Sequence, residues 1–373
     1  MHDVVSCTDS PTQPKVHLAQ TWWRNALAAA TAVVAVITSA GSDASAQTRN
    51  IIQRGDAVVT GFAGTVAPTE PPADVHPLDR TFIDLKGLTA QIFDLSNLGG
   101  GPAGQLADAP VKFKATAGQV GHVFGIAFEG DGSSTPPNIF LAASSMYGLQ
   151  IVKQDGSETR RLVNGEAGAK FMAGQFGPGR GGPGSIYRVD GRTGEIKLFA
   201  NVQREGRANS GPGLGNLAYD NRSKQLFATD LETGLIHRFT MDGRERDVFD
   251  HGTDGRRRAG LAAAPYDPAG RVGVENPSFN AEDATTWGHA PTERMTFGLA
   301  VQGRRLYYSV GEGPQIWSVG IDDEGDFGSD ARLEIEVKDT PAGNVVTAIQ
   351  FDGSGMMYLA QRGEFTGSYD YQL

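Results

Sequence analysis

The clearest hydrophobic pattern in the chain lies at residues 216–243, where three short apolar segments alternate with two polar ones. Segments 216–219, 225–229 and 235–240 have the length and the aromatic and β-branched content of strands. Between them, residues 220–223 and 232–234 supply the Asp, Asn, Ser, Thr and Gly that tight turns need. This stretch therefore predicts an antiparallel meander of three strands.

Similar phrases recur before and after this stretch, each with an apolar strand, a polar loop, a second strand and a final turn. They read IFLAASSMYGLQIVKQDG, QLFATDLETGLIHRFTMDG and RLYYSVGEGPQIWSVGIDDEG. A period of about 40 to 50 residues with up to four strands is that of a propeller blade. We therefore predict an all-β chain, a β-propeller of five to six blades whose inner strands are apolar on both faces.

The phrases NLAYD, QLFATD and GLIHRFTMDG, with their counterparts over residues 123–363, resemble the repeats of the NHL-repeat and gluconolactonase-like six-bladed β-propeller superfamily. Gluconolactonase-like enzymes hold a divalent ion at the central channel with carboxylate and asparagine side chains. The resemblance implies Asp230 and Asn216 as metal ligands, although Asn216 is one position off the family's Asn-Gly-Leu-Ala phrase. Oxygen ligands suit Ca²⁺. The alternative is that Asp230 caps a turn and Asn216 bonds its own backbone.

The N-terminus has the features of an export signal. Residues 25–40 are apolar and follow Arg24, but a membrane span needs about 20 apolar residues. The small-x-small sequence at residues 44–46 is typical of signal-peptidase cleavage. We predict a signal peptide at residues 1–46, a periplasmic or secreted protein, and no membrane span after cleavage; an uncleaved anchor is the alternative.

The rest of the chain divides by composition. Residues 47–79 form an N-terminal segment with a Pro-rich linker, and residues 80–373 form the propeller domain. Within that domain, residues 80–95 are candidates for the strands that close the last blade. Residues 250–294 form a long inserted loop, and the Gly-rich residues 174–184 are expected to be a flexible connection between strands.

Charge and cysteine content exclude several functions. The formal net charge is −10, which argues against nucleic acid and anionic membrane as main partners. Cys7 is the only cysteine and lies in the signal peptide, so the exported chain has no disulfide and no cysteine nucleophile. Fifty glycines among 373 residues indicate many turns. Neither a His-Glu-x-x-His motif nor a Gly-x-Ser-x-Gly motif occurs.

These observations favour an exported β-propeller that acts as a binding or protein-interaction module for a protein or small-molecule ligand. No catalytic or cofactor-binding residue is identified. The insert supplies the candidate binding residues, and we expect an exposed aromatic patch there; the candidates are Trp287, His289, His251 and Phe279. Three alternatives stay open: a variable loop with no role, a metal-dependent lactonase-like hydrolase, and an N-terminal scaffold fragment of a larger surface protein.

Overall fold

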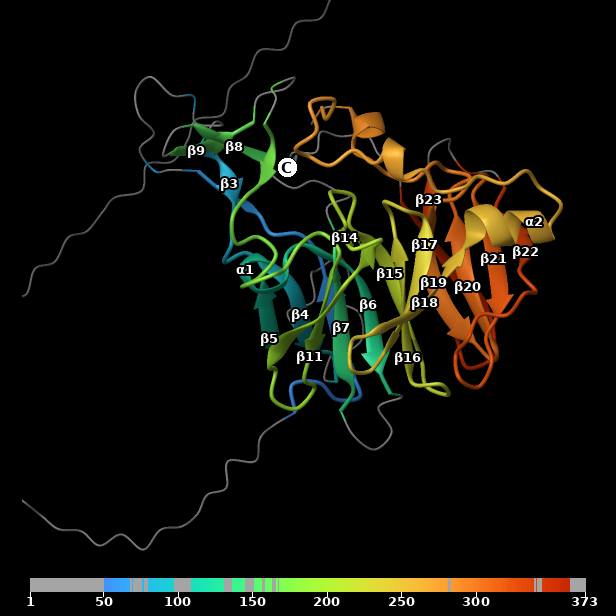
Figure 1. Cartoon of the computed structure of the whole chain (residues 1–373). Helices are drawn as coiled ribbons and strands as arrows, with labels where there is room; N and C mark the ends of the chain where they lie inside the picture. Colours follow the sequence, from blue (N-terminus) through green and yellow to red (C-terminus); the bar gives the residue numbers. More distant parts are fainter. Residues whose placement is uncertain are drawn as a thin grey trace, which may run out of the picture. The chain divides into compact units, whose positions relative to one another are not determined.

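The computed structural model consists mainly of antiparallel β-sheets (Figure 1). The structure describes residues 50–67, 69, 76, 80–96, 109–130, 136–144, 151–155, 158–162, 166, 168–280, 283–338, 340 and 344–362. The predicted signal peptide and much of the predicted Pro-rich linker lie outside these residues. Among the residues described, no helix has the length and apolar character needed to cross a membrane.

Two sheets are complete four-stranded meanders in chain order, as the repeat predicted. The first contains β15 (Leu214–Asp220), β16 (Gln225–Asp230), β17 (Leu235–Thr240) and β18 (Glu245–Asp250). The second contains β19 (Thr296–Gln302), β20 (Arg305–Val310), β21 (Gln315–Gly320) and β22 (Arg332–Glu336).

A third four-stranded sheet has the order β12-β11-β7-β6 and includes a long excursion. Its strands are β6 (Val123–Glu129), β7 (Asn138–Ala143), β11 (Ser185–Val189) and β12 (Ile196–Asn201). Between β7 and β11 the chain forms a separate small sheet of β8 (Ile151–Asp155), β9 (Glu158–Arg161) and β10 (Lys170–Phe171). The repeat phrase that begins at residue 139 predicted that residues 139–143 and 148–152 are consecutive strands of one meander. In the structure β7 pairs instead with the apolar β11, and β8 belongs to the separate small sheet.

A three-stranded sheet precedes these, with β4 (Leu88–Asp94) between β1 (Asp56–Thr60) and β5 (Val111–Thr116). The prediction that residues 80–95 close the last blade is therefore wrong in this structure, since both edges of β4 are taken by β1 and β5. The predicted domain boundary at residue 80 is also too late, because β1 lies before it. Sequence reasoning missed β5, although its sequence, VKFKAT, alternates apolar and polar residues.

The remaining elements are a hairpin, two short ribbons and a short helix. The last hairpin pairs β23 (Val345–Phe351) with β24 (Met357–Arg362). Two-stranded ribbons join β2 (Thr65–Val66) to β3 (Phe82–Ile83) and β13 (Gln203–Arg204) to β14 (Arg207–Ala208). The helix α1 (Ala117–Val120) connects β5 to β6.

The core lies between the sheets, which stack face to face. The first strands β6, β15, β19 and β23 contact one another in chain order. Strand β16 is buried on both faces: Phe227 packs toward the β19–β22 sheet, whereas Leu226 packs toward the β6–β12 sheet. Meanders stacked through apolar strands around their first strands form a β-propeller-like fold.

Two buried hydroxyls connect consecutive sheets. Each first strand carries a bulge, and the register shifts between Leu214 and Leu217 in β15. Opposite this bulge, Thr229 accepts a hydrogen bond from the Asn216 amide at 2.8 Å and donates to the Phe297 carbonyl of the next sheet at 2.8 Å. The Thr229 hydroxyl thus gives the backbone amide at the bulge a hydrogen-bond acceptor and also links two sheets.

The same arrangement recurs one sheet later. Ser309 accepts from the Gly298 amide at 2.7 Å and donates to the Val346 carbonyl of β23 at 2.6 Å. Thr229 and Ser309 are 0% and 1% exposed, so water cannot replace these bonds.

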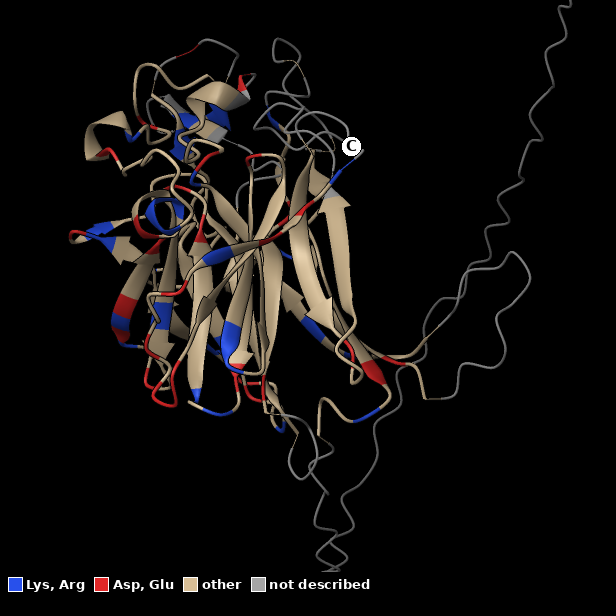
Figure 2. Cartoon of the chain, turned by 90° about the vertical axis from the view of Figure 1, so that its right-hand side faces the viewer, with Lys and Arg blue, Asp and Glu red and all other residues tan. Residues whose placement is uncertain are grey.

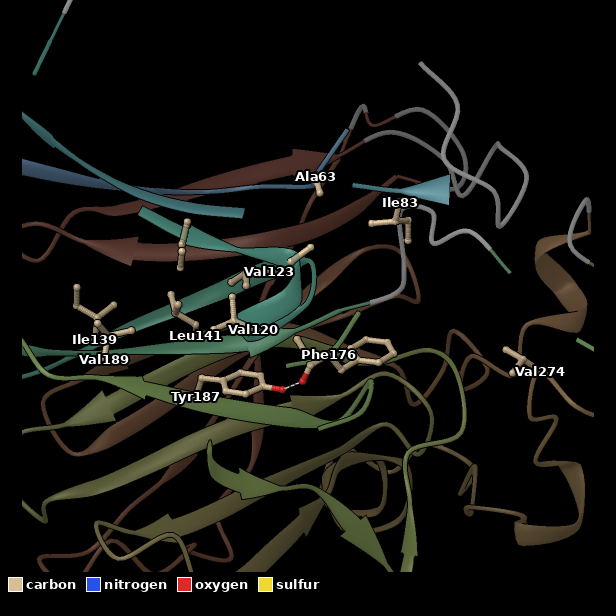
Figure 3. Close-up of a cluster of buried hydrophobic side chains, with 14 of the residues drawn as sticks. Ala63, Ile83, Val120, Val123, Ile139, Leu141, Phe176, Tyr187, Val189 and Val274 are labelled. Carbon is tan, nitrogen blue, oxygen red and sulfur yellow. Dashed lines mark hydrogen bonds between the residues drawn. The ribbon is translucent and has the colours of Figure 1, made fainter. Parts of the chain in front are cut away.

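The Gly-rich residues 174–184, expected to be flexible, pack tightly against α1 and β11. The Tyr187 hydroxyl donates to the Phe176 carbonyl, and both residues belong to the core cluster drawn in Figure 3. A Cβ at Gly181 would lie 1.8 Å from that carbonyl, so glycine is required there for close approach. Glycine content here reflects packing rather than mobility.

Charged residues gather mainly in the loops at the two ends of the strands, while the strands themselves are largely uncharged (Figure 2). Carboxylates in the acidic segment 322–330 form ion pairs with arginines of the β19–β22 sheet and of the preceding β15–β18 sheet. Asp323 pairs with Arg222 and Asp326 with Arg238. These ion pairs link loops of consecutive sheets.

We predict that Thr229→Val and Ser309→Ala each lower the free energy of unfolding by about 1–3 kcal/mol, because each leaves a buried amide and carbonyl unpaired. Chemical denaturation monitored by tryptophan fluorescence measures this loss. The control is Thr292→Val, which changes an exposed hydroxyl and should stay within about 0.5 kcal/mol of the wild type. A Thr229→Val protein as stable as the control would contradict the proposed role of the hydroxyl.

Candidate functional site

The long insert begins at the end of β18 and lies along one end of the sheets (Figure 1). It starts with a π-helical turn, His251–Gly255, and continues into the short helix α2 (Arg256–Arg258). Two 3₁₀ turns follow, Pro268–Gly270 and Ala284–Thr286. Before β19, the Ala290 amide donates to the Leu231 carbonyl at 2.8 Å, which attaches the insert to the β16–β17 turn.

Arg294 is the central anchor of the insert and is 1% exposed. Its guanidinium donates to the carbonyls of Thr233 and Ala264, both at 2.7 Å, and to the Asp250 carboxylate at 3.1 Å. It also lies 5.7 Å from the centre of the Tyr266 ring. Burial lowers the pKa of Arg294, and Asp250 opposes this shift. The bonds join both ends of the insert to the turn after β16.

Arg256 fixes the first half of the insert in a similar way. Its Nε donates to the Ala262 carbonyl at 2.7 Å, and its Nη1 donates to the Glu293 carbonyl at 3.3 Å. The same guanidinium forms an ion pair with Glu312, in the loop between β20 and β21. The basic cluster at residues 256–258 is therefore not simply solvated, because its first arginine is buried.

Arg271 anchors the middle of the insert through a buried ion pair. Its Nε and Nη2 donate to the two Glu232 carboxylate oxygens at 2.6 and 2.7 Å. Ser210 also donates to both oxygens, through its amide and its hydroxyl. The Glu232 side chain is 1% exposed, and this burial raises its pKa. The two carboxylate oxygens of Glu232 thus accept four hydrogen bonds, two from Arg271 and two from Ser210.

Asp230, one of the two predicted metal ligands, is 2% exposed and is held by hydrogen bonds within the protein. It accepts from the Asn209 amide group at 2.7 Å, the Glu232 backbone amide at 3.0 Å and the Thr233 hydroxyl at 2.6 Å. Burial opposes its ionisation, but the contacts with His237 and Thr233 prevail and lower its pKa. In this geometry Asp230 caps the β16–β17 turn.

Asn216, the other predicted ligand, makes different contacts. Its Nδ2 donates to the Thr347 carbonyl of β23 at 3.1 Å, and its Oδ1 accepts from the Leu217 amide at 2.8 Å. The structure gives Asn216 and Asp230 separate partners and no shared contact. Among the described residues, no group of three or more His, Cys, Asp or Glu side chains has the geometry to hold a metal ion. The Ca²⁺ site stays a prediction.

His237 joins the Asp230 network from β17. It is fully buried, with Nδ1 2.9 Å from a Glu245 carboxylate oxygen and Nε2 3.7 Å from Asp230. Burial favours the neutral ring, but the two carboxylates outweigh it and raise the pKa of His237 to about 9. The ring therefore carries a proton at neutral pH and balances the buried carboxylate.

His251, predicted to face a ligand, is instead part of the core. It is 0% exposed; its Nδ1 lies 3.1 Å from the Tyr308 hydroxyl, and its ring meets Trp317 edge to face at 4.6 Å. Burial lowers the pKa of His251 to about 3. A neutral imidazole packed between two aromatic rings stabilises the start of the insert.

The predicted exposed aromatic patch is wrong. Phe279 and Trp287 are 4% and 2% exposed and belong to the core cluster that also contains Val274. The Trp287 indole donates to the Asn280 carbonyl at 3.0 Å. His289 lies beside Trp287, and burial lowers its pKa to about 4. The aromatic residues of the insert form its base, because they find apolar partners in a core cluster made mostly of residues outside the insert.

Sequence reasoning missed the arginine anchors. Arg271 and Glu232 are separated by 39 positions, and Arg294 and Asp250 by 44. Ion pairs at such separations leave no periodic pattern. The one available signal is that Arg294 lies two positions before the repeat at residues 296–301, where the insert must rejoin the sheet.

We predict that stability falls as pH decreases from about 6.5 toward 3, in part through His251. The unfolded chain binds a proton at His251 in this range and the folded chain does not, so the loss reaches about 1.4 kcal/mol per pH unit. Urea unfolding at several pH values measures the slope for the wild type and for His251→Gln. The variant should be less stable at pH 7 and lose less on acidification; equal slopes would contradict the assignment.

No family model matches the chain, and no curated protein is significantly similar to it in sequence. Comparison with solved structures finds matches, two of which have low sequence identity and low TM-scores. The crystal structure of a protein from Lactobacillus plantarum is 13% identical with a TM-score of 0.33, over 82% of this chain and 75% of that one. A chain in the crystal structure of a nidogen/laminin complex is 12% identical with a TM-score of 0.23, over 71% and 89%. The fold assignment therefore depends on the sheets described above.

Proposed function

We propose that this chain is an exported β-propeller that binds a protein or small-molecule ligand on the outer surface of its insert. The observation that carries the proposal is the anchoring of the insert by three buried arginines, Arg256, Arg271 and Arg294. A long loop held at its start, middle and end presents its outer residues in one arrangement. Binding then costs less conformational entropy than binding by a free loop.

The outer residues of the insert have the composition of a recognition surface. Leu261 is 42% exposed, and Arg257 and Arg258, three and four positions before it, are exposed as well. A surface with exposed aliphatic and cationic side chains can contact both apolar and polar parts of a ligand. Phe279 and Trp287 attach the later part of the insert to the core.

Binding is favoured over hydrolysis because the polar side chains that the resemblance implies for a metal are engaged elsewhere. Asp230 and Asn216 would each have to give up hydrogen bonds within the protein to reach an ion. We further propose that the ring contains five or six blades of the NHL-repeat and gluconolactonase-like type, which the meanders in chain order support.

To test the binding surface, a photoreactive amino acid replaces Leu261 in the tagged full-length protein, expressed in the source organism and irradiated. Cross-linked products are identified by mass spectrometry, which detects protein and small-molecule adducts alike. The control places the same amino acid at Met356, which is 59% exposed and lies outside the insert. We expect a specific adduct at position 261 alone. The same products at both positions, or none at 261, would rule out this surface.

Export is tested separately. We expect the protein recovered from the periplasm or medium to begin at Gln47, because cleavage after Ala46 follows the small-x-small sequence. Intact-mass analysis of that fraction measures the N-terminus, and Ala46→Tyr should slow the cleavage because a bulky residue does not fit the peptidase. Recovery of the protein only from the cytoplasm with residues 1–46 intact would contradict export.

A further inference from the structure

The hairpin of β13 and β14 places two arginines directly opposite each other. Arg204 pairs with Arg207 across the ribbon, and the turn between them contains Glu205 and Gly206, both with positive φ, at 53° and 73°. Directly opposite residues of an antiparallel pair project their side chains on one face, about 5 Å apart at Cβ. Like charges in this arrangement destabilise a ribbon.

Neither arginine is neutralised among the described residues. Arg204 and Arg207 form no ion pair with a described carboxylate, and Glu205, on the turn itself, is not within ion-pair distance of either. The Arg204 Nε is buried and has no acceptor in the described part of the chain. A buried guanidinium N–H without an acceptor is costly, and an acceptor from outside the chain would remove that cost.

The insert adds two groups beside this hairpin. Arg271 donates through Nη2 to the Ala208 carbonyl at the base of the hairpin, while Glu232 is already fully used by Arg271 and Ser210. Burial raises the pKa of the Tyr266 hydroxyl, and the charges of Arg271, Glu232, Asp230 and Arg207 also act on it. That hydroxyl has no hydrogen-bond partner among the described residues, so it is free to donate to a ligand.

We propose that Arg204, Arg207 and Tyr266 form a binding site for an anionic group with several acceptor oxygens: a carboxylate, sulfate or phosphate. The planar guanidinium groups supply paired donors that match such oxygens, and the tyrosine hydroxyl adds a third donor. An anion between the two arginines also removes the repulsion across the hairpin. The proposal rests on the proposed binding function and specifies the chemical class of its ligand.

The test measures anion binding to the purified full-length protein. Calorimetric titrations use sodium phosphate, sodium sulfate and sodium malonate, each at constant ionic strength set with sodium chloride. We expect at least one of these anions to bind, and the anion that binds most tightly identifies the source of the acceptor oxygens. Arg204→Gln and Arg207→Gln should each raise its Kd about tenfold or more, because each removes charge-assisted hydrogen bonds.

Two further variants separate binding from folding. Tyr266→Phe keeps the ring beside Arg294 and should weaken binding by a smaller factor. Arg246→Gln removes an exposed arginine on β18 that forms no ion pair among the described residues, and it should bind like the wild type. Without added anion, the Tm of Arg204→Gln should equal or exceed that of the wild type, because a like-charge pair is lost.

Failure to bind any of the three anions more tightly than chloride would overturn the proposal, as would equal affinity in Arg204→Gln and the wild type. Such a result would leave the cross-linking test at Leu261 unaffected, because that test depends on the outer surface of the insert and not on the hairpin.

Discussion

Sheets that stack face to face share no ladder hydrogen bonds, so the bulged amides of their first strands need partners of another kind. Thr229 and Ser309 provide them, each accepting from a bulge in its own sheet and donating to a carbonyl in the next. Because these hydroxyls are buried, the spacing of consecutive sheets is set by hydrogen-bond length as well as by apolar packing. Everything built at the ends of the strands depends on that spacing.

The insert is attached to this frame through charged contacts as well as through its buried aromatic residues. Arg294 reaches the turn after β16, Arg271 reaches Glu232 in the same turn, and Arg256 reaches the loop after β20. A buried guanidinium group forms directional hydrogen bonds to several acceptor oxygens. These bonds fix the position of the insert more strictly than apolar contacts do. Rigidity of the insert surface, which binding requires, thus comes from the strand ends beneath it.

The aromatic residues that the sequence predicted for recognition belong to the core. The arginines that hold the insert in place were not predicted from the sequence. Phe279, Trp287 and His251 are buried because an aromatic ring in contact with solvent gains stability from any available apolar surface. Arg204 and Arg207 remain without carboxylate partners among the described residues. A functional group is better recognised by its unmet hydrogen-bonding capacity than by its size.

The sequence by itself determined the strands and their meanders, because alternation and turn residues act over a few positions; the strands at 225–229 and 305–310 lie where the pattern predicted. Tertiary structure alone decided that β7 pairs with β11 across the β8–β10 excursion, and that β4 lies between β1 and β5. It also decided the partners of Asp230 and Glu232. Pairings across tens of residues depend on which surfaces meet in space, and no local pattern encodes them.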